Sequence, residues 1–459
     1  MEEISNQTQG TTDMTVGSPR RHILLFALPI LAGNVFQQLY SMVDAIVVGK
    51  AVGGMALAGV GTTVPIVTLI TSLFAGMGLG ASVLLSQFYG AGDLDKVRRL
   101  VSSVYSLLLP IIAVLTAVSL PLAGVLLRLL HVPPGDTFTM ARLYMMIVIP
   151  GFLGSFGFYL NAGILQSMGN STVPFLFLCL ACGMNIVLDL VFVFLFHWGV
   201  VGAAMATVIS ETFSWVVGVV YINRRYSFLH LTLLKFDVDK KLLVHVARVG
   251  LPTGISQSLF SLGNVFMQRL INEYGTLFMA GFTGANHLNT FATMPIQSID
   301  TAVTTFTGQN IGQGRLDRVR RGLRAGLLMA GGYGAVIGVL ALPFGGDLMS
   351  LFVNEESVIR VGVVFLRTVL PFFVLQAVLY VLNAVLRGSG RAVVPMVSML
   401  VSMLLVRVLS AYSLAAVFGA DSMFYSYGLG WAAGIVISAG SYLYVRRRIR
   451  GVPQKRPKM

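Results

Sequence analysis

The sequence has few charged residues for a chain of its length. Only 11% of its 459 residues are Asp, Glu, Lys or Arg, whereas 56% are hydrophobic, and the mean hydropathy is +0.81. Soluble domains carry about 25% charged residues, so this chain has too little charge to cover a water-exposed surface. The composition excludes an ordinary soluble protein and predicts a polytopic membrane protein.

Cysteine is also scarce, and the sequence lacks any catalytic set of residues. Cys179 and Cys182 form a C-x-x-C inside an apolar run, without the second ligand pair of a zinc site or the βαβ context of a redox motif. Core packing is the better interpretation of both. There is no Gly-rich loop with Lys-Ser/Thr, no H-E-x-x-H and no pair of aspartate-rich prenyl-transfer motifs. We therefore expect neither an enzyme nor direct use of ATP.

Twelve apolar runs are long enough to cross a bilayer, which takes about 20 residues each. This pattern predicts an all-α membrane protein. No cleavable signal peptide is visible, and the polar residues at the start predict a short, disordered cytoplasmic tail. The runs cover approximately residues 22–48, 55–86, 100–128, 139–168, 172–196, 199–222, 247–272, 279–309, 322–345, 360–387, 393–418 and 423–445.

The net charge of +14 comes from short basic clusters at the ends of the apolar runs. All of them fall on the side that the N-terminus, the even-to-odd loops and the C-terminus share, so the positive-inside rule predicts a cytoplasmic location for both termini. A positive charge can also indicate nucleic-acid binding, but this distribution favours topology signalling. The clusters lie at residues 20–21, 96–99, 224–241, 315–324, 387–391 and 446–458.

The chain contains two related halves. QFYGAGDLDKVRR begins at Gln87 and QNIGQGRLDRVRR begins 222 residues later (309 − 87), with eight of thirteen positions identical. NAGILQSMGNSTVP at Asn161 and NAVLRGSGRAVVP at Asn383 repeat at the same offset. Six helices per half predict parallel repeats, two six-helix bundles related by a pseudo-two-fold axis along the membrane normal. The predicted parts are a tail (1–21), a first lobe (22–223), a cytoplasmic linker (224–246), a second lobe (247–445) and a basic tail (446–459).

A carboxylate lies within the first apolar run. Helical spacing places Gln37, Tyr40 and Asp44 on one face. A charge in hydrocarbon costs roughly 2.5–3.5 kcal/mol on insertion scales, so it normally faces a partner, a cavity or an ion path. The alternative is a carboxylate that reaches the interface from a helix end. Gln37 and Tyr40 are candidates for a substrate cleft.

Further polar residues of the first half are predicted at the same membrane depth as Asp44. Asn185 and Asp189 are one turn apart in the fifth run, and Thr207 lies early in the sixth. Their oxygens suit Na⁺, whereas two neighbouring carboxylates could instead share a proton near neutral pH. We predict a coupling site for Na⁺ or H⁺ from these residues, with Asn161 on the fourth run as a further candidate.

The second half does not repeat this pair of polar residues. Its intramembrane ionisable residues include Arg269, Asp300 and Arg407. Asp300 either neutralises an arginine or contributes with Arg407 to a substrate cleft. Glu211, one turn after Thr207, is interpreted as structural.

The motifs together resemble the multidrug and toxic compound extrusion (MATE) transporters. LPILAGNVFQQLYSMVDAIVVG, SQFYGAGD, LNAGILQSMGNSTVP, NIVLD and GAAMATVIS carry the resemblance, with GLPTGISQSLFSLGNVF and GQNIGQG in the second half. It implies twelve helices in two bundles and export of drug-like, often cationic compounds, driven by Na⁺ or H⁺. In one branch the cation site matches Asp44, Asn185, Asp189 and Thr207 here. A second branch uses acids on helices 7 and 10, which this sequence lacks.

Three functions compete at this stage. The first is a cation-coupled antiporter that works by alternating access, and the second is a lipid-linked precursor flippase of the same superfamily, for which Arg269 and Arg407 could hold a pyrophosphate. The third, a membrane enzyme or scaffold, lacks a catalytic constellation. We expect a monomer in the plasma membrane with a small organic substrate, membrane lipid around it, no nucleic-acid partner and no cofactor beyond the coupling ion.

Overall fold

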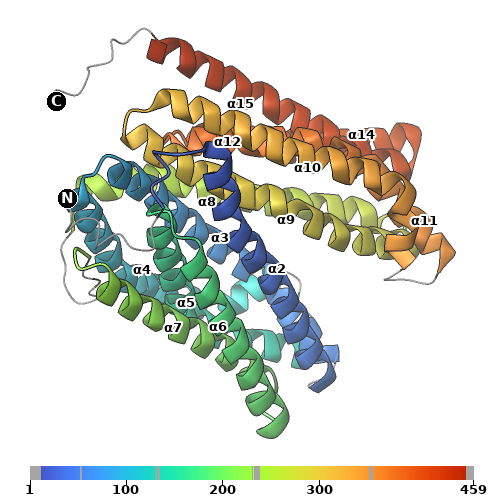
Figure 1. Ribbon diagram of the computed structural model, residues 1–459. Helices are drawn as coiled ribbons and strands as arrows, with labels where there is room; N and C mark the ends of the chain where they lie inside the picture. Colours follow the sequence, from blue (N-terminus) through green and yellow to red (C-terminus); the bar gives the residue numbers. More distant parts are fainter. Residues whose placement is uncertain are drawn as a thin grey trace, which may run out of the picture. The chain divides into compact units, whose positions relative to one another are not determined.

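The protein is built from helices, and the described residues contain no strand (Figure 1). The computed structural model describes residues 12–51, 54–129, 132, 135–229, 231, 238–350 and 355–450. Within these ranges, the side chains of residues 44–60, 64–65, 108–109, 129, 341 and 445–450 are not described. The fold class predicted from composition is confirmed.

Six long helical stretches make up the first half of the chain. Each coincides with one predicted apolar run, and a π-helical segment ends the fifth. They are α2 (Pro19–Ala51), α3 (Gly54–Gly90), α4 (Leu94–Leu129), α5 (Asp136–Ser167), α6 (Thr172–Asp189) with the π-helix η1 (Leu190–Leu195), and α7 (Gly199–Arg225).

The second half has six stretches as well, two of them interrupted by 3₁₀ or π turns. They are α8 (Lys240–Asn272), α9 (Thr276–Gly312), α10 (Leu316–Ser350), α11 (Glu356–Val369) with η2 (Leu370–Phe372) and α12 (Phe373–Gly388), α13 (Val393–Met399) with η3 (Leu400–Val406) and α14 (Arg407–Phe418), and, after η4 (Ala420–Tyr425), α15 (Ser426–Arg450). Within the described residues, nine of the twelve stretches are long and apolar enough to cross a membrane, and α8, α9 and α15 complete the predicted set.

The sequence repeat is also a repeat of the backbone. The ends of α3 and α9 lie 222 residues apart, as do the starts of α4 and α10. Gly92 and Gly314 occupy the same place in the two turns, and both have φ of +75°, a left-handed conformation that glycine adopts without steric cost. Gly169 (φ +85°) and Gly390 (φ +80°) form the second matched pair. The repeated glycines are therefore required by the turns that join the helices.

The chain divides into two compact units. The first unit comprises Met1–Gly254 and Gly308–Arg315, and the second comprises Ile255–Thr307 and Leu316–Met459. The start of α8 and the end of α9 therefore pack with the first half of the chain. The predicted linker at 224–246 precedes this division, and its residues 230 and 232–237 lie outside the described part of the chain.

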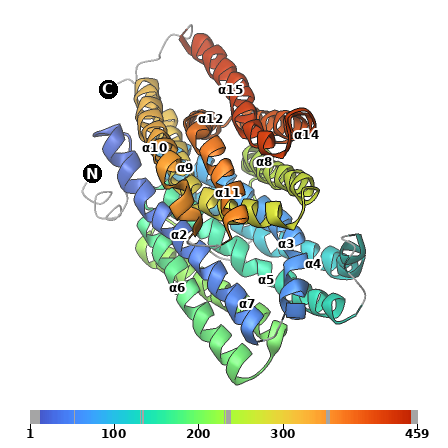
Figure 2. The same ribbon diagram turned by 90° about the vertical axis from the view of Figure 1, so that its right-hand side faces the viewer.

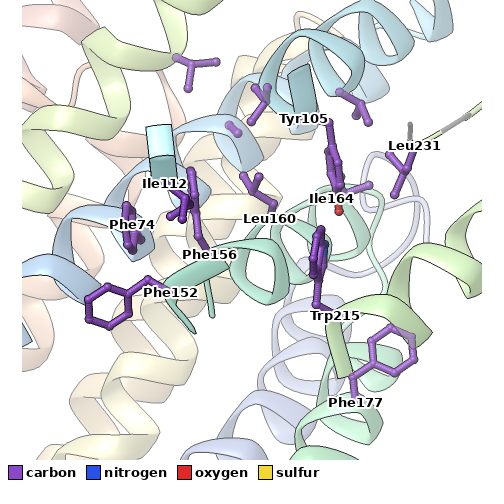
Figure 3. Close-up of a cluster of buried hydrophobic side chains, with 14 of the residues drawn as sticks. Phe74, Tyr105, Ile112, Phe152, Phe156, Leu160, Ile164, Phe177, Trp215 and Leu231 are labelled. Atoms are coloured by element: carbon purple, nitrogen blue, oxygen red, sulfur yellow. The ribbon is translucent and has the colours of Figure 1, made fainter. Parts of the chain in front are cut away.

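The first unit packs its helices around an aromatic core. α5 contacts both α3 and α7, and α2 runs beside α6, as Figures 1 and 2 both show. Phe74 stacks on Phe156 with ring centroids 4.6 Å apart and meets Phe152 edge-on (Figure 3). Aromatic pairs of this geometry add about 0.5–1.5 kcal/mol beyond area burial. This core holds α5 as the central helix, against which the helices of the candidate site are placed.

Small residues allow α3 and the start of α8 to cross in close contact. A Cβ on Gly80 would lie 2.5 Å from the Cα of Gly250, and one on Gly76 would lie 2.3 Å from the Cα of Gly254. Distances below 3 Å to backbone atoms leave no room for a methyl group. These four glycines therefore form a close helix crossing of the kind common in membrane proteins.

Residues 12–18, which directly precede α2, make defined contacts, and this corrects the prediction of a disordered tail for that segment. Met14 and Thr15 are buried. The backbone N–H of Met14 donates to Gln309 Oε1 (3.0 Å), and its carbonyl accepts from Asn310 Nδ2 (3.2 Å). Arg315 Nη1 donates to the carbonyl of Thr15 (2.8 Å). Sequence pattern missed this because the partners lie about 300 positions away.

The second unit has its own core between α10, α12 and α15. Phe365 lies edge-on to Phe424 at 5.1 Å and to Phe282 at 5.4 Å, which ties α11 to η4 and α9. Figure 2 shows α11 leading into α12. Each unit therefore buries its own aromatic residues.

Candidate functional site

Three of the predicted coupling residues come together between α6 and α7. Asn185 and Asp189 are 1% and 0% exposed, and they lie one turn apart on α6 as the sequence predicted. Thr207 on α7 faces them, with its Oγ1 3.4 Å from the amide of Asn185. The prediction that these three side chains lie close together is confirmed, and their role in coupling stays a prediction.

The Asn185 amide is oriented by Asp189 and by the backbone of Thr207. With its Nδ2 toward Asp189, it donates to Oδ2 at 2.7 Å, while its Oδ1 accepts from the backbone N–H of Thr207 at 3.1 Å. With the amide turned over, its oxygen would face the carboxylate oxygen and Nδ2 would face the Thr207 N–H, so that only the contact of Nδ2 with Thr207 Oγ1 remains. Hydrogen-bond partners decide between such orientations. They favour the first, in which Asn185 donates to the Asp189 carboxylate.

Asp44 belongs to the same group of helices, although its side chain lies outside the described residues. Its helix, α2, packs against α6, η1 and α7. The sequence prediction that Asp44 faces the Asn185–Asp189 pair is therefore not tested, and it stays a prediction.

The α-helix ends directly after Asp189. The six residues Leu190–Leu195 form the π-helix η1, whose wider turns shift the register of the following side chains. π-helical segments within longer helices occur frequently at functional sites. The buried carboxylate of Asp189 thus lies at the junction of two helical geometries.

Asn161 takes part in a different set of contacts. Its Oδ1 accepts a hydrogen bond from the hydroxyl of Tyr105, and its Nδ2 donates to the carbonyl of Trp215 at 3.0 Å. Figure 3 shows Tyr105 and Trp215 in this part of the core, beside Leu160 and Ile164. These contacts join α4, α5 and α7, so Asn161 acts here as a packing residue. Its predicted role in cation binding has no support from these partners.

A pocket opens in the first unit, next to the cluster of Asn185, Asp189 and Thr207. Gln37 and Tyr40 of α2 line it, as do Tyr159 and Glu211. Ser155 donates its hydroxyl hydrogen to Glu211 Oε2. Glu211 lies one turn beyond Thr207 on α7. The pocket and the cluster of Asn185, Asp189 and Thr207 therefore share this helix. The sequence analysis interpreted Glu211 as structural. A carboxylate within an apolar run is nevertheless a general indication of a functional site in a membrane protein.

The ionisable residues of the second half are placed in separate surroundings. Asp300 forms an ion pair with Arg387, whose Nη2 lies 2.6 Å from Oδ2 and 2.7 Å from Oδ1. Arg269 lines a surface pocket with Glu273, and Arg407 lines another pocket. Of the two roles left open for Asp300, neutralisation of an arginine is therefore confirmed. The partner is Arg387, which the sequence pattern assigned to a basic loop cluster because it ends α12.

The fold and the buried polar cluster define a multi-pass membrane protein of the transporter class. The chain belongs to the MatE family, whose model matches residues 29–191 and 252–413. The two matched segments begin 223 residues apart (252 − 29), close to the repeat offset of 222. The family predicted from the motifs is thereby confirmed, together with its twelve helices in two bundles.

Named relatives and a solved structure cover almost the whole chain. The chain is 28% identical over 439 residues to the probable multidrug resistance protein YpnP of Bacillus subtilis, covering 95% of this chain and 96% of that protein. It is 26% identical to the probable multidrug resistance protein NorM of Thermotoga maritima, covering 87% and 86%. A structure described as the outward-facing conformation of a multidrug resistance MATE family transporter matches with a TM-score of 0.87 and 25% identity, covering 96% and 98%.

Proposed function

We propose that this protein exports cationic organic compounds in exchange for a cation, by alternating access across the plasma membrane. The family and the names of its relatives support small-molecule efflux. The observation that carries the proposal is a pair of carboxylates in the first unit: Asp189, which is fully buried beside Asn185, and the partly buried Glu211, which lines the adjoining pocket. One serves the coupling ion and the other serves the substrate.

The burial of Asp189 supports H⁺ as the coupling ion. Its side chain is fully buried, and the neutral amide of Asn185 donates to its Oδ2 at 2.7 Å. A buried carboxylate costs free energy unless it is paired with an opposite charge, so uptake of a proton removes a charge from this site. Asp44 and Thr207 are expected to complete this site, and Na⁺ held by the same oxygens is the alternative to be tested.

Glu211 and the aromatic residues around it suit an organic cation. The pocket includes the rings of Tyr40, Phe158 and Tyr159 beside the carboxylate. A ligand cation over an aromatic face gains about 0.5–2 kcal/mol, and the partly buried carboxylate of Glu211 adds a direct charge contact. We propose that Glu211 holds the positive charge of the substrate, with Gln37 as a hydrogen-bonding partner.

The basic clusters support a location of both termini in the cytoplasm. They lie at alternate helix ends throughout the chain, as the positive-inside rule requires. In this orientation Asn185 and Thr207 lie in the outer half of the membrane, and Asp44 and Asp189 lie at the same depth.

The lipid-linked precursor flippase is less well supported. A pyrophosphate needs several cationic side chains that converge on one cavity. Among the described residues of the second unit, Arg269 and Arg407 line different pockets, and Arg387 is neutralised by Asp300. The first-unit pocket contains a carboxylate.

Transport in proteoliposomes tests the substrate assignment. We expect the purified wild type to move ethidium, and Glu211→Gln to raise the half-saturating ethidium concentration at least about tenfold, because it removes the charge contact and keeps the shape. Asp347→Asn, an exposed carboxylate at the end of α10, is the matched control and should transport like the wild type. Unchanged half-saturation in Glu211→Gln would contradict the role of this residue. Flipping of a lipid pyrophosphate without ethidium transport would contradict the proposed function.

A further inference from the structure

A second pocket lies wholly within the second unit and has the opposite charge. It is formed by α8, α9, α12, α15 and the junction of η3 with α14. Its lining is mostly neutral amides and hydroxyls, among them Asn264, Asn289 and Gln376, and it contains one ionisable group that carries a charge, Arg407. This lining is unusual inside helices that must cross hydrocarbon.

Arg407 is fixed in this pocket without an acidic partner. Arg407 is only 2% exposed, and its Nη1 donates a hydrogen bond to Asn264 Oδ1 at 3.1 Å. The guanidinium lies over the ring of Tyr427, 3.9 Å from its centroid. No carboxylate approaches it within 4 Å among the described side chains. The other buried arginine of this unit, Arg387, has its acid in Asp300.

Several polar atoms in the same pocket lack a hydrogen-bond partner. They are Nε of Arg407, Oδ1 of Asn289 and Oε1 of Gln376, each shielded from solvent. A buried, unsatisfied polar group costs about 1–3 kcal/mol, and more where it carries charge. The site therefore has an unused donor on the arginine and an unused acceptor oxygen on each of two amides, which a bound ligand with both acceptor and donor groups would satisfy.

We propose that this pocket binds the carboxylate of a small organic anion. The flat guanidinium, held by Tyr427 on one face, presents its edge for two parallel hydrogen bonds, the geometry in which arginine recognises carboxylates. A single positive charge among neutral amides matches a single negative charge, so a monocarboxylate fits better than a diphosphate. The amide oxygens of Asn289 and Gln376 accept hydrogen bonds from N–H or O–H groups of the same ligand.

This anion site is separate from the carboxylate-lined pocket of the first unit. All of its residues belong to the second unit, and its charge is opposite to that of Asp189 and Glu211. Binding at this site is measured without transport, so failure of cation export and failure of anion binding are distinguishable results.

Trp431 offers a direct probe, because it lines the pocket. The other two tryptophans, Trp198 and Trp215, belong to the first unit. We would titrate the purified full-length protein with sodium benzoate and, in parallel, with benzamide, its neutral counterpart of similar shape. The expected result is a saturable fluorescence change with benzoate, absent in Trp431→Phe, and an affinity for benzamide at least about tenfold weaker. Equal affinities, or no saturable change, would overturn the proposal.

Asn264→Asp is the sharpest variant. It places a carboxylate where the amide oxygen already contacts Arg407. The arginine therefore stays in place, but the new carboxylate at position 264 neutralises its charge. Benzoate affinity should fall at least about tenfold, as in Arg407→Gln, and thermal stability should be kept or raised. Arg391→Gln, an exposed arginine after α12, is the control and should bind like the wild type. If Arg407 is only structural, Asn264→Asp changes stability and leaves the response to benzoate unaltered, which overturns the proposal.

Discussion

Asn161 and Asn185 show that two asparagines in apolar helices can have different tasks. Asn185 contacts a carboxylate and a hydroxyl, whereas Asn161 joins the Tyr105 hydroxyl to the backbone of Trp215. An amide can donate to a neighbouring carboxylate, but it can also simply satisfy buried donors and acceptors. Only the identity of the partners separates these roles, and this is information that a single sequence does not contain.

Replacement of Asn161 tests that distinction at the residue scale. Asn161→Leu should lower the free energy of unfolding by about 1–3 kcal/mol, because it leaves the buried Tyr105 hydroxyl without a partner and removes the side-chain bond to α7 at Trp215. The ion dependence of transport by the folded fraction should not change. Thermal unfolding in detergent and transport at varied pH check the two parts. Normal stability with lost ion dependence would instead make Asn161 a coupling residue.

The helices themselves are organised by small residues and by turns. α3 crosses the start of α8 where Gly76 and Gly80 face Gly250 and Gly254, and this contact belongs to the first unit. The repeated turns before α4 and α10 depend on Gly92 and Gly314 with positive φ. Element boundaries in the two halves therefore match because the same local requirements occur twice.

A pair of alanine substitutions tests the helix crossing. Gly80→Ala should destabilise the protein by about 1–3 kcal/mol, because its Cβ would lie 2.5 Å from a backbone atom of α8 and the helices must separate. Gly183→Ala in α6, where no atom lies within 4 Å of the added Cβ, should instead stabilise it by about 0.5–1 kcal/mol. Thermal unfolding in detergent measures both. Equal effects of the two substitutions would show that close approach of α3 and α8 does not matter for stability.

For the whole molecule, the sequence predicted much more of the fold than of the contacts. Hydropathy predicted the twelve runs, and the motifs predicted the repeat and the family. These signals can be read from the sequence because they are local or recur at one fixed offset. The spacing of Asn185 and Asp189 also predicted a shared helix face. Pairings at arbitrary sequence distance were missed, such as Arg387 with Asp300, 87 positions apart. The burial of Met14 depends on such a contact as well.

The coupling ion is the central claim at this scale, since it joins the buried cluster to net transport. Residues of one unit hold the carboxylate and its amide, and in the proposed mechanism exchange of a proton at Asp189 is linked to movement of the substrate across the membrane. Asp189→Asn removes the titrating group and keeps its shape, so it should bind substrate yet fail to accumulate it against a gradient.

The most direct measurement is ethidium accumulation in proteoliposomes with a pH gradient in the absence of Na⁺, compared with a Na⁺ gradient at constant pH. The account predicts accumulation driven by the pH gradient alone in the wild type and in Asp347→Asn, with Asp189→Asn reduced to passive equilibration. Accumulation driven only by the Na⁺ gradient, or accumulation that survives in Asp189→Asn, would contradict it.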